Sequence, residues 1–328
     1  MNLRRKLGEQ MSKSLGIIGG MGPKATSVFF DKVIESTDAH KDQDHINMVI
    51  LNHATLPDRT ETILSGDDGA FLDEIRKDIE ILEKAGVSNI AIPCNTSHYF
   101  YEKIQEMTDI HVIHMIEETI KEISEKYGRT AKIGIMATNG TIKSDIYKKV
   151  ANSFGLEVYY PDPDTQAQIM DIIYNKVKSD LTLDVTEIEN IVFDFIFNHE
   201  CSCVILACTE LSCIQLNKDV EKYCVDAMEV LVKRSIELSG KYVKGQHFDE
   251  FLTESFANDT YERELRLSSQ ECEAVKKRFP HATITSLDQE IDTDGKAWYK
   301  VNLISDDKPF SDHSGVQETL ENKQRIKV

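Results

Sequence analysis

Two segments decide the fold of this chain, Ala91-Ile92-Pro93-Cys94-Asn95-Thr96 and Val204-Ile205-Leu206-Ala207-Cys208-Thr209-Glu210. Each is an apolar run of strand character that ends at a cysteine, and polar residues that start a predicted helix follow. In open α/β sheets, ligands bind at this carboxyl end of the strands. A helix N-terminus beside a cysteine also favours the thiolate over the thiol. The repetition predicts two α/β halves, each placing one cysteine in a shared cleft.

The chain from residue 14 to about residue 242 alternates between predicted strands and predicted helices. The strands are short and rich in Val and Ile, as buried parallel strands are. We expect them at residues 15–20, 46–52, 89–95, 111–114, 132–138, 157–160, 202–208 and 223–226. Amphipathic segments predict helices at residues 70–85, 142–154, 164–178 and 185–199. This alternation implies right-handed βαβ units and parallel sheets, the α/β fold class.

The two halves are weak internal repeats, separated by a polar, glycine-containing joint at residues 126–132. We therefore expect a first lobe of residues 14–127 plus 224–242 and a second lobe of residues 128–223.

The pattern changes after the second lobe, and residues 243–328 are expected to form a small α+β extension. Residues 274–278 have helical character, and two alternating runs flank the turn signal Asp292-Thr293-Asp294-Gly295, which predicts a β-hairpin. The polar tail from residue 305 is expected to be disordered. An isolated hairpin is only marginally stable, so we expect this one to pack on the rest of the protein or on a second subunit and to bury Trp298.

Composition excludes several classes of function. The chain has 328 residues and a net charge of −18, whereas a nucleic-acid surface needs a basic stripe. No apolar run approaches the roughly 18 residues of a membrane span, and residues 1–13 lack the apolar core of a signal peptide. The seven cysteines are odd in number and irregularly spaced, which argues against structural disulfides. We expect a cytoplasmic protein that binds neither membrane nor nucleic acid.

A glycine-rich segment, Gly16-Ile17-Ile18-Gly19-Gly20-Met21-Gly22-Pro23, runs from the first predicted strand into the loop before the next predicted helix. Its spacing departs from the dinucleotide fingerprint, and the second strand ends in Asn52 and His53 where that fingerprint has an acidic residue. The glycines instead allow the backbone to pass close to a small ligand, whose carboxylate the main-chain N–H groups can bind.

Five motifs in order resemble the aspartate/glutamate racemase superfamily, with the aspartate racemase branch the most similar. They are Gly19-Gly20-Met21-Gly22-Pro23, Pro57-Asp58-Arg59-Thr60, Pro93-Cys94-Asn95-Thr96, Ala137-Thr138-Asn139-Gly140-Thr141 and Ala207-Cys208-Thr209-Glu210. The resemblance implies two lobes related by a pseudo-two-fold axis, with the active site between them. It also implies a racemase that needs no pyridoxal phosphate, acts on a small amino acid and forms a homodimer. We expect no cofactor and no metal.

The resemblance and the chemistry together nominate the site residues. Cys94 and Cys208 are expected to be the catalytic pair, because a thiolate on one face of Cα and a thiol on the other run the reaction in both directions. Donors suited to the substrate carboxylate are Asn95, Thr96, Thr138 and Thr209. In the family the arginine that matches Arg59 faces the distal carboxylate, and so does the lysine that matches Lys178. The remaining expected substrate contacts are Met21, Gly22, Asn139, Thr141 and Glu210, with Glu210 orienting Cys208 or the substrate amine.

Two alternatives remain open from the sequence. A maleate isomerase or hydantoin racemase would keep the lobes and both thiols but catalyse another reaction; the Pro57-Asp58-Arg59-Thr60 segment favours an acidic amino acid instead. A catalytically idle scaffold would use the C-terminal element to bind a partner; the presence of both Cys94 and Cys208 weighs against it. Aspartate and glutamate are not distinguished, since one methylene changes binding by only about 1–3 kcal/mol.

Overall fold

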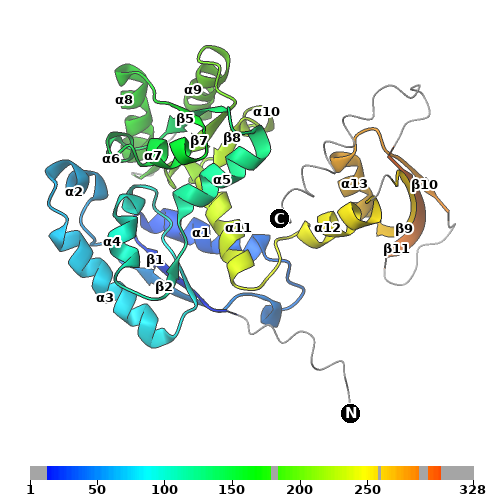
Figure 1. The fold of residues 1–328 in the computed structure, drawn as a ribbon, viewed down its shortest axis with the longest axis horizontal. Coiled ribbons are helices and arrows are strands. Elements are labelled where there is room, and N and C mark those ends of the chain that lie inside the picture. The colour runs from blue at the N-terminus through cyan, green and yellow to red at the C-terminus, as the bar shows by residue number, and fades with distance from the viewer. Residues whose placement is uncertain (1–12, 179–183, 258–259, 288–294, 304–328) are drawn as a thin grey trace. The chain divides into compact units, whose positions relative to one another are not determined.

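The computed structural model describes residues 13–178, 184–257, 260–287 and 295–303. The described residues up to Val243 form one compact unit and those from Lys244 onward form a second (Figure 1). The tail from residue 305 and most of the expected turn at residues 292–295 lie outside the described residues.

The first unit begins with a parallel four-stranded sheet in the order β2-β1-β3-β4. Its strands are β1 (Leu15–Gly19), β2 (Met48–Asn52), β3 (Asn89–Ala91) and β4 (His111–Val112). Every residue of β1 is buried, as expected for a central parallel strand that is covered on both faces. The helical segments of this half are α1 (Pro23–Ser36), η2 (Asp42–Asp44), α2 (Arg59–Ser65), α3 (Gly69–Ala85), η3 (Thr96–Phe100), α4 (Tyr101–Gln105) and α5 (Met115–Tyr127).

The second sheet repeats this topology, with parallel strands in the order β6-β5-β7-β8. Its strands are β5 (Lys132–Met136), β6 (Glu157–Tyr159), β7 (Cys203–Leu206) and β8 (Cys224–Asp226). The helical segments are α6 (Asn139–Lys143), α7 (Ile146–Ser153), α8 (Pro163–Asp171), the π-helix η4 (Ile172–Val177), α9 (Val185–Phe197), η5 (Leu211–Cys213), α10 (Lys218–Glu221) and α11 (Ala227–Leu238). The predicted α/β class with two parallel-sheet halves is therefore confirmed.

Some local predictions need correction. β8 pairs with β7, so residues 224–226 belong to the second sheet and not to the first lobe. The helix predicted over residues 142–154 is interrupted at Asp145, whose φ of 54° is left-handed, and α6 and α7 lie on either side. The segment after Cys208 forms only a short 3₁₀ turn, η5, and the one after Cys94 starts as the 3₁₀ helix η3.

Three hydrophobic clusters hold the first unit together. The largest joins the two sheets, because it contains residues of β1, such as Ile17, and residues of β5, such as Ile135. The other two lie on the opposite faces, one between the first sheet and α3, and one between the second sheet and α9. α11 follows β8 in the chain but packs on α1 and α5. The two lobes therefore share one core on their inner faces.

The second unit is a three-stranded antiparallel sheet in the order β10-β11-β9, together with two helices. Its elements are α12 (Gln246–Ser255), β9 (Glu262–Ser268), α13 (Ser269–Arg278), β10 (Thr283–Ser286) and β11 (Lys296–Asn302). Leu252, Phe256, Leu267 and Val275 are among the residues of its own core. The pairing of β10 with β11 agrees with the predicted hairpin, whereas α12 and β9 were not predicted. Trp298 is 45% exposed, so the core of the second unit does not bury it; its burial against the rest of the protein or a second subunit stays a prediction.

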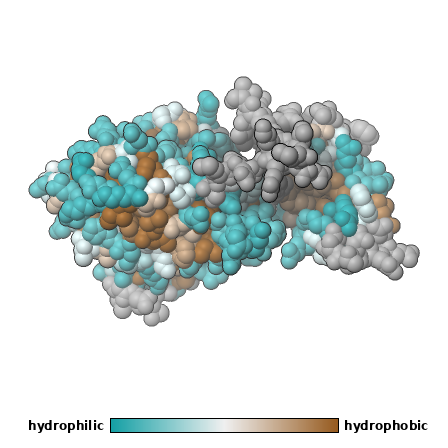
Figure 2. Space-filling model, turned by 90° about the horizontal axis from the view of Figure 1, so that it is seen from below, coloured by the Kyte–Doolittle hydropathy of each residue, from teal (hydrophilic) through white to brown (hydrophobic). Residues whose placement is uncertain are grey.

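None of the described helices is both long and apolar enough to cross a membrane. Figure 2 shows that hydrophobic side chains gather on one face of the first unit, with hydrophilic residues around them.

Candidate active site

The two cysteines occupy equivalent places in the two sheets. Cys94 follows β3, which pairs with β1, and Cys208 follows β7, which pairs with β5. β1 and β5 are the corresponding central strands of sheets that share one strand order. Both thiols are nearly buried, with 6% of each residue exposed.

Both cysteines line one small cavity in the first unit. Its walls are Met21, Asp58, Arg59, Thr60, Cys94, Asn95, Thr96, Thr138, Tyr174, Lys178, Cys208, Thr209 and Glu210. Ten of the thirteen residues nominated from the sequence are in this set. The cavity volume is about 10 Å³, which is about the space needed for one water molecule. An amino acid therefore enters only if the walls move apart.

The other three nominated residues do not line the cavity, and only two of them lie beside it. A Cβ atom on Gly22 would come within 3.3 Å of Glu210 Oε1, so the loop after β1 passes close to that carboxylate. Thr141 is buried and bonds to hydroxyls that line the cavity. Asn139 is exposed and its Oδ1 accepts a hydrogen bond from Gln166, so the structure does not bring its side chain to the cavity.

A carboxylate and an ammonium group lie beside Cys208. Its Sγ donates to Glu210 Oε2 at 2.9 Å, and Lys178 Nζ lies 3.8 Å from Glu210 Oε1. Burial and the negative charge of Glu210 raise the pKa of Cys208 well above its usual value, while Lys178 opposes them. In this arrangement Cys208 is a protonated thiol that can donate a proton.

Lys178, and not Lys176, is the lysine of the cavity wall. Lys176 forms ion pairs with Asp171 and Glu187, away from the cysteines. Lys178 Nζ lies 4.0 Å from the centre of the Tyr174 ring, which is one helical turn earlier in the sequence. Burial lowers the pKa of Lys178, but the Glu210 carboxylate and other negative neighbours outweigh it, so the net shift is upward. Lys178 therefore stays charged at neutral pH.

Three threonine hydroxyls join the two lobes at the cavity. Thr96 Oγ1, from the first lobe, lies 3.1 Å from Thr138 Oγ1 and 3.0 Å from Thr141 Oγ1, both from the second. Thr138 is also the N-cap of α6, where its side chain accepts from the Thr141 N–H. This cluster fixes the lobes relative to each other beside Cys94.

Arg59 begins α2 and reaches the cavity from the loop after β2. Its Nη1 donates to the carbonyls of Pro57 at 3.0 Å and Leu56 at 3.5 Å, while its buried Nε has no hydrogen-bond partner. The preceding Asp58 caps α2 by accepting from the Glu61 N–H. The guanidinium is thus held by its own loop, and its buried Nε–H remains available to a ligand.

The loop that carries Cys94 is supported by His98. Its Nδ1 lies 2.9 Å from the Cys94 carbonyl oxygen and its Nε2 3.3 Å from that of Ile113. Burial lowers the pKa of His98, and a neutral imidazole donates from only one of its two nitrogens. His98 therefore supports the loop that carries Cys94 through its backbone.

Sequence reasoning missed three residues of the cavity wall. Asp58 and Thr60 flank Arg59 in a motif that had already been singled out, so their position in the chain was an available signal. Tyr174 lies four residues before Lys178, a spacing that places two side chains on the same face of a helix. Its hydroxyl lies 3.4 Å from Thr60 Oγ1, which is another contact between the lobes.

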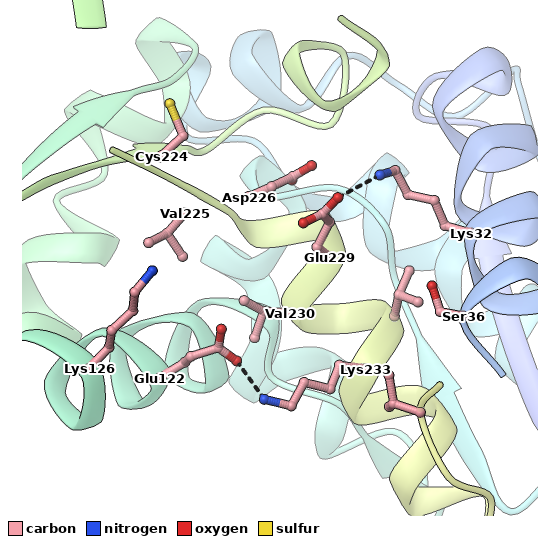
Figure 3. Close-up of a pocket in the computed structure, with 12 residues that line it drawn as sticks. Lys32, Ser36, Glu122, Lys126, Cys224, Val225, Asp226, Glu229, Val230 and Lys233 are labelled. Carbon is pink, nitrogen blue, oxygen red and sulfur yellow. Dashed lines mark hydrogen bonds and ion pairs between the residues drawn. The ribbon is translucent and has the colours of Figure 1, made fainter. Parts of the chain in front are cut away.

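A larger cavity of about 390 Å³ lies elsewhere in the first unit, among α1, α5, β8 and α11 (Figure 3). Two ion pairs lie in its wall, Lys32 with Glu229 at 2.8 Å and Lys233 with Glu122 at 3.2 Å. Its walls share no residue with the cysteine cavity. Among the described residues, no group of three or more His, Cys, Asp or Glu side chains is arranged to hold a metal ion.

Comparison with known proteins identifies the family. The model of the Asp/Glu/hydantoin racemase family matches residues 18–234. A broad-specificity amino-acid racemase, RacX, from Bacillus subtilis (strain 168) is 34% identical over 229 residues, which cover 68% of this chain and 96% of the relative. Residues 244–328 lie outside the family match.

Solved structures show the same fold. The aspartate racemase of Picrophilus torridus superposes with a TM-score of 0.61 at 29% identity, covering 72% of this chain and 97% of that one. An aspartate racemase homologue from Pyrococcus horikoshii OT3 has a TM-score of 0.59 at 24% identity, covering 70% and 99%. The chain belongs to the Asp/Glu/hydantoin racemase family, and is thus an enzyme of the isomerase class.

Proposed function

We propose that this protein is a cofactor-independent aspartate or glutamate racemase that uses Cys94 and Cys208 as its two acid–base groups. One observation carries the proposal: both thiols line one cavity, although they follow corresponding strands of two different sheets. Two groups placed from opposite lobes are what a reaction that exchanges the two faces of Cα requires.

The chemistry follows from the surroundings of the thiols. In one direction of the proposed reaction, the Cys94 thiolate removes the α-proton and the electron pair of the C–H bond moves onto the α-carboxylate. Cys208, which already donates its S–H to Glu210, then gives its proton to the opposite face of Cα. The reaction leaves Cys94 as the thiol and Cys208 as the thiolate, ready for the reverse direction. Proton transfer by a positioned group contributes roughly 10²–10⁴-fold, and hydrogen bonds to the carboxylate supply further stabilisation.

A dicarboxylic substrate is favoured by the two cations of the cavity wall. Arg59 has an unpaired buried N–H, and Lys178 lies 3.8 Å from Glu210 Oε1. Arg suits a carboxylate because its planar fork can donate two parallel hydrogen bonds. We assign Arg59 and Lys178 to the distal carboxylate, with Asn95, Thr96, Thr138 and Thr209 near the α-carboxylate.

The proposed setting is the cytoplasm, because the catalytic thiols must stay reduced and all seven cysteines are free. We propose a homodimer as its assembly. The hydrophobic patch in Figure 2 is of the kind that subunit contacts cover.

The test of this function is a survey of α-proton exchange. The purified full-length chain is incubated in D₂O with single amino acids, and both deuterium at Cα and the ratio of enantiomers are measured. Turnover of hydantoins and of maleate is measured in parallel. We expect aspartate or glutamate to be exchanged and inverted fastest. Turnover of hydantoins or maleate alone would favour the related isomerases, and no turnover of any of these compounds would favour the idle scaffold.

A further inference from the structure

A buried tyrosine outside the cavity wall contacts a residue beside Cys94. Tyr147, on α7 of the second lobe, is fully buried and its hydroxyl donates to Asn95 Oδ1 at 2.5 Å. Asn95 follows Cys94 in the first lobe and is 2% exposed. The bond therefore crosses from one lobe to the other, next to one of the two thiols.

This bond determines which end of the Asn95 amide remains for a ligand. Asn95 lines the cavity, whereas Tyr147 does not. With Oδ1 held by Tyr147, the other end of the amide is Nδ2, which is buried and has no hydrogen-bond partner. Leaving a buried donor without an acceptor is unfavourable, so such a group in a binding site indicates an acceptor on the ligand.

The tyrosine is suited to act as a permanent donor. Burial raises the pKa of Tyr147 well above its usual value, and the nearby Asp226 and Cys208 raise it further. The hydroxyl therefore keeps its proton across the neutral range. The reverse orientation of the amide would present Oδ1 to the ligand, and a carbonyl oxygen repels a carboxylate.

We propose that Tyr147 is a positioning residue that holds the Asn95 amide so that its Nδ2 group donates to the substrate α-carboxylate. The inference rests on the proposed racemase function. When the α-proton leaves, negative charge accumulates on the carboxylate oxygens, and a fixed donor stabilises the transition state more than the ground state. Tyr147 acts through Asn95 and does not itself touch the substrate.

The test is a double-mutant cycle on racemisation by the full-length enzyme. Removing one donor to a developing negative charge typically costs roughly 10²–10³-fold in kcat, so Asn95→Ala is expected in that range. Tyr147→Phe keeps the ring but frees the amide, and we expect kcat to fall about 10-fold or more with KM changed by less than about 3-fold. The double variant should match Asn95→Ala within about 3-fold, because the two residues act as a unit. Asn95→Asp, which keeps the acceptor for Tyr147 but lacks the donor, should be as impaired as Asn95→Ala.

The matched control is Tyr101→Phe, which removes a hydroxyl that donates to the Val112 carbonyl at 3.2 Å outside the cavity. It should keep wild-type kcat even if the melting temperature falls as much as in Tyr147→Phe. Losses that multiply in the double variant, or an unchanged kcat in Tyr147→Phe, would overturn the positioning role. If the wild-type enzyme exchanges no α-proton, the proposed function itself is wrong and the positioning role falls with it.

Discussion

The residue two places after each cysteine differs between the lobes. Thr96 occupies this position after Cys94, and Glu210 occupies it after Cys208. The Glu210 carboxylate accepts a hydrogen bond from the Cys208 thiol. The hydrogen bond from Cys208 to Glu210 makes the pair asymmetric before substrate binds. The thiol beside Glu210 resists deprotonation, and Lys178 counteracts this effect.

Removal of either charge should shift the pH dependence in a defined direction. Glu210 raises the pKa of Cys208, so Glu210→Gln is expected to lower it and to move the alkaline limb of the kcat/KM profile to lower pH. Lys178 lowers that pKa, so Lys178→Met should move the same limb to higher pH. The measurement is kcat/KM against pH for both variants and the wild type. If the alkaline limb of the profile keeps its wild-type position in both variants, or moves in the same direction in both, then Glu210 and Lys178 do not have opposite effects on the pKa of Cys208.

Arg59 should set the preference for dicarboxylates. If Arg59 binds the distal carboxylate of the substrate, the Arg59→Ala variant leaves this carboxylate without a partner. The loss of binding free energy is then about 2–5 kcal/mol, which lowers kcat/KM for aspartate about 30-fold or more. Alanine racemisation, measured in parallel, should change far less because alanine has no distal carboxylate. Arg59→Lys is the matched variant, which keeps the charge and loses the fork, and should recover only part of the loss. Equal losses on both substrates would assign Arg59 a structural role.

At the scale of elements, the buried strands were the most predictable features. Runs such as residues 132–136 and 203–206 are apolar and β-branched, and both form central strands. The segments after the cysteines were overestimated as helices, because local propensity does not show that β7 is followed by only a three-residue 3₁₀ turn. β9 was missed because only Leu265 and Leu267 are buried among its charged residues.

The candidate site was predictable where chemistry and sequence position coincide. Cys94, Cys208 and their neighbours belong to short motifs, and they do line one cavity. Tyr147 carried no such signal, because in the sequence it is only one of the apolar positions of an amphipathic helix. Its role becomes visible in the folded chain, where its hydroxyl lies 2.5 Å from Asn95 Oδ1. Contacts between residues 52 positions apart depend on the packing of the lobes, which no local pattern encodes.

The contact between α2 and α6 gives a prediction about lobe closure. A Cβ atom on Gly140 would lie 2.8 Å from Thr60 Oγ1 and 2.9 Å from Thr60 Cα, too close for either atom. Gly140→Ala should therefore push α2 away, destabilise the fold by about 1–3 kcal/mol and lower kcat/KM about 10-fold or more, since Arg59 and Thr60 move with α2. Thermal unfolding and aspartate kinetics measure both effects.

Gly69→Ala is the control for this substitution. The nearest atom to its added Cβ would be Asp67 Oδ1, at an ordinary 3.6 Å, so stability and activity should be unchanged or slightly improved. If Gly140→Ala behaves like Gly69→Ala, close packing of α2 on α6 is not needed for catalysis.

At the scale of the whole molecule, the boundary between the units lies at Val243. Asp38 N–H donates to the Tyr242 carbonyl at 2.8 Å, and Thr37 pairs with Val243, so these two residues complete the first unit. The second unit has its own core, and in the part of the chain that the structure describes the walls of the cysteine cavity are all residues of the first unit.

A chain that ends after Val243 should therefore remain a racemase. We expect its kcat to stay within about 3-fold of the full-length value, because every residue of the cavity wall is retained. The melting temperature and the mass in solution should be determined together with the kinetics, since loss of the second unit can change stability or assembly. A well-folded truncated protein with the same number of subunits as the full-length protein, but without any turnover, would mean that the second unit completes the active site.

The central claim is that two thiols exchange protons with opposite faces of one carbon. Its most direct test is the isotope at Cα during the first turnovers of L-aspartate, or of L-glutamate if that is the better substrate, in D₂O. A thiol that exchanges with solvent delivers deuterium to the product, so the newly formed D-enantiomer should carry deuterium while the remaining L-substrate keeps protium. Cys94→Ser and Cys208→Ser should each abolish this inversion, because a hydroxyl is far too weak a base at neutral pH. A product that retains the original protium, or either serine variant with near-normal racemisation, would contradict the two-thiol account.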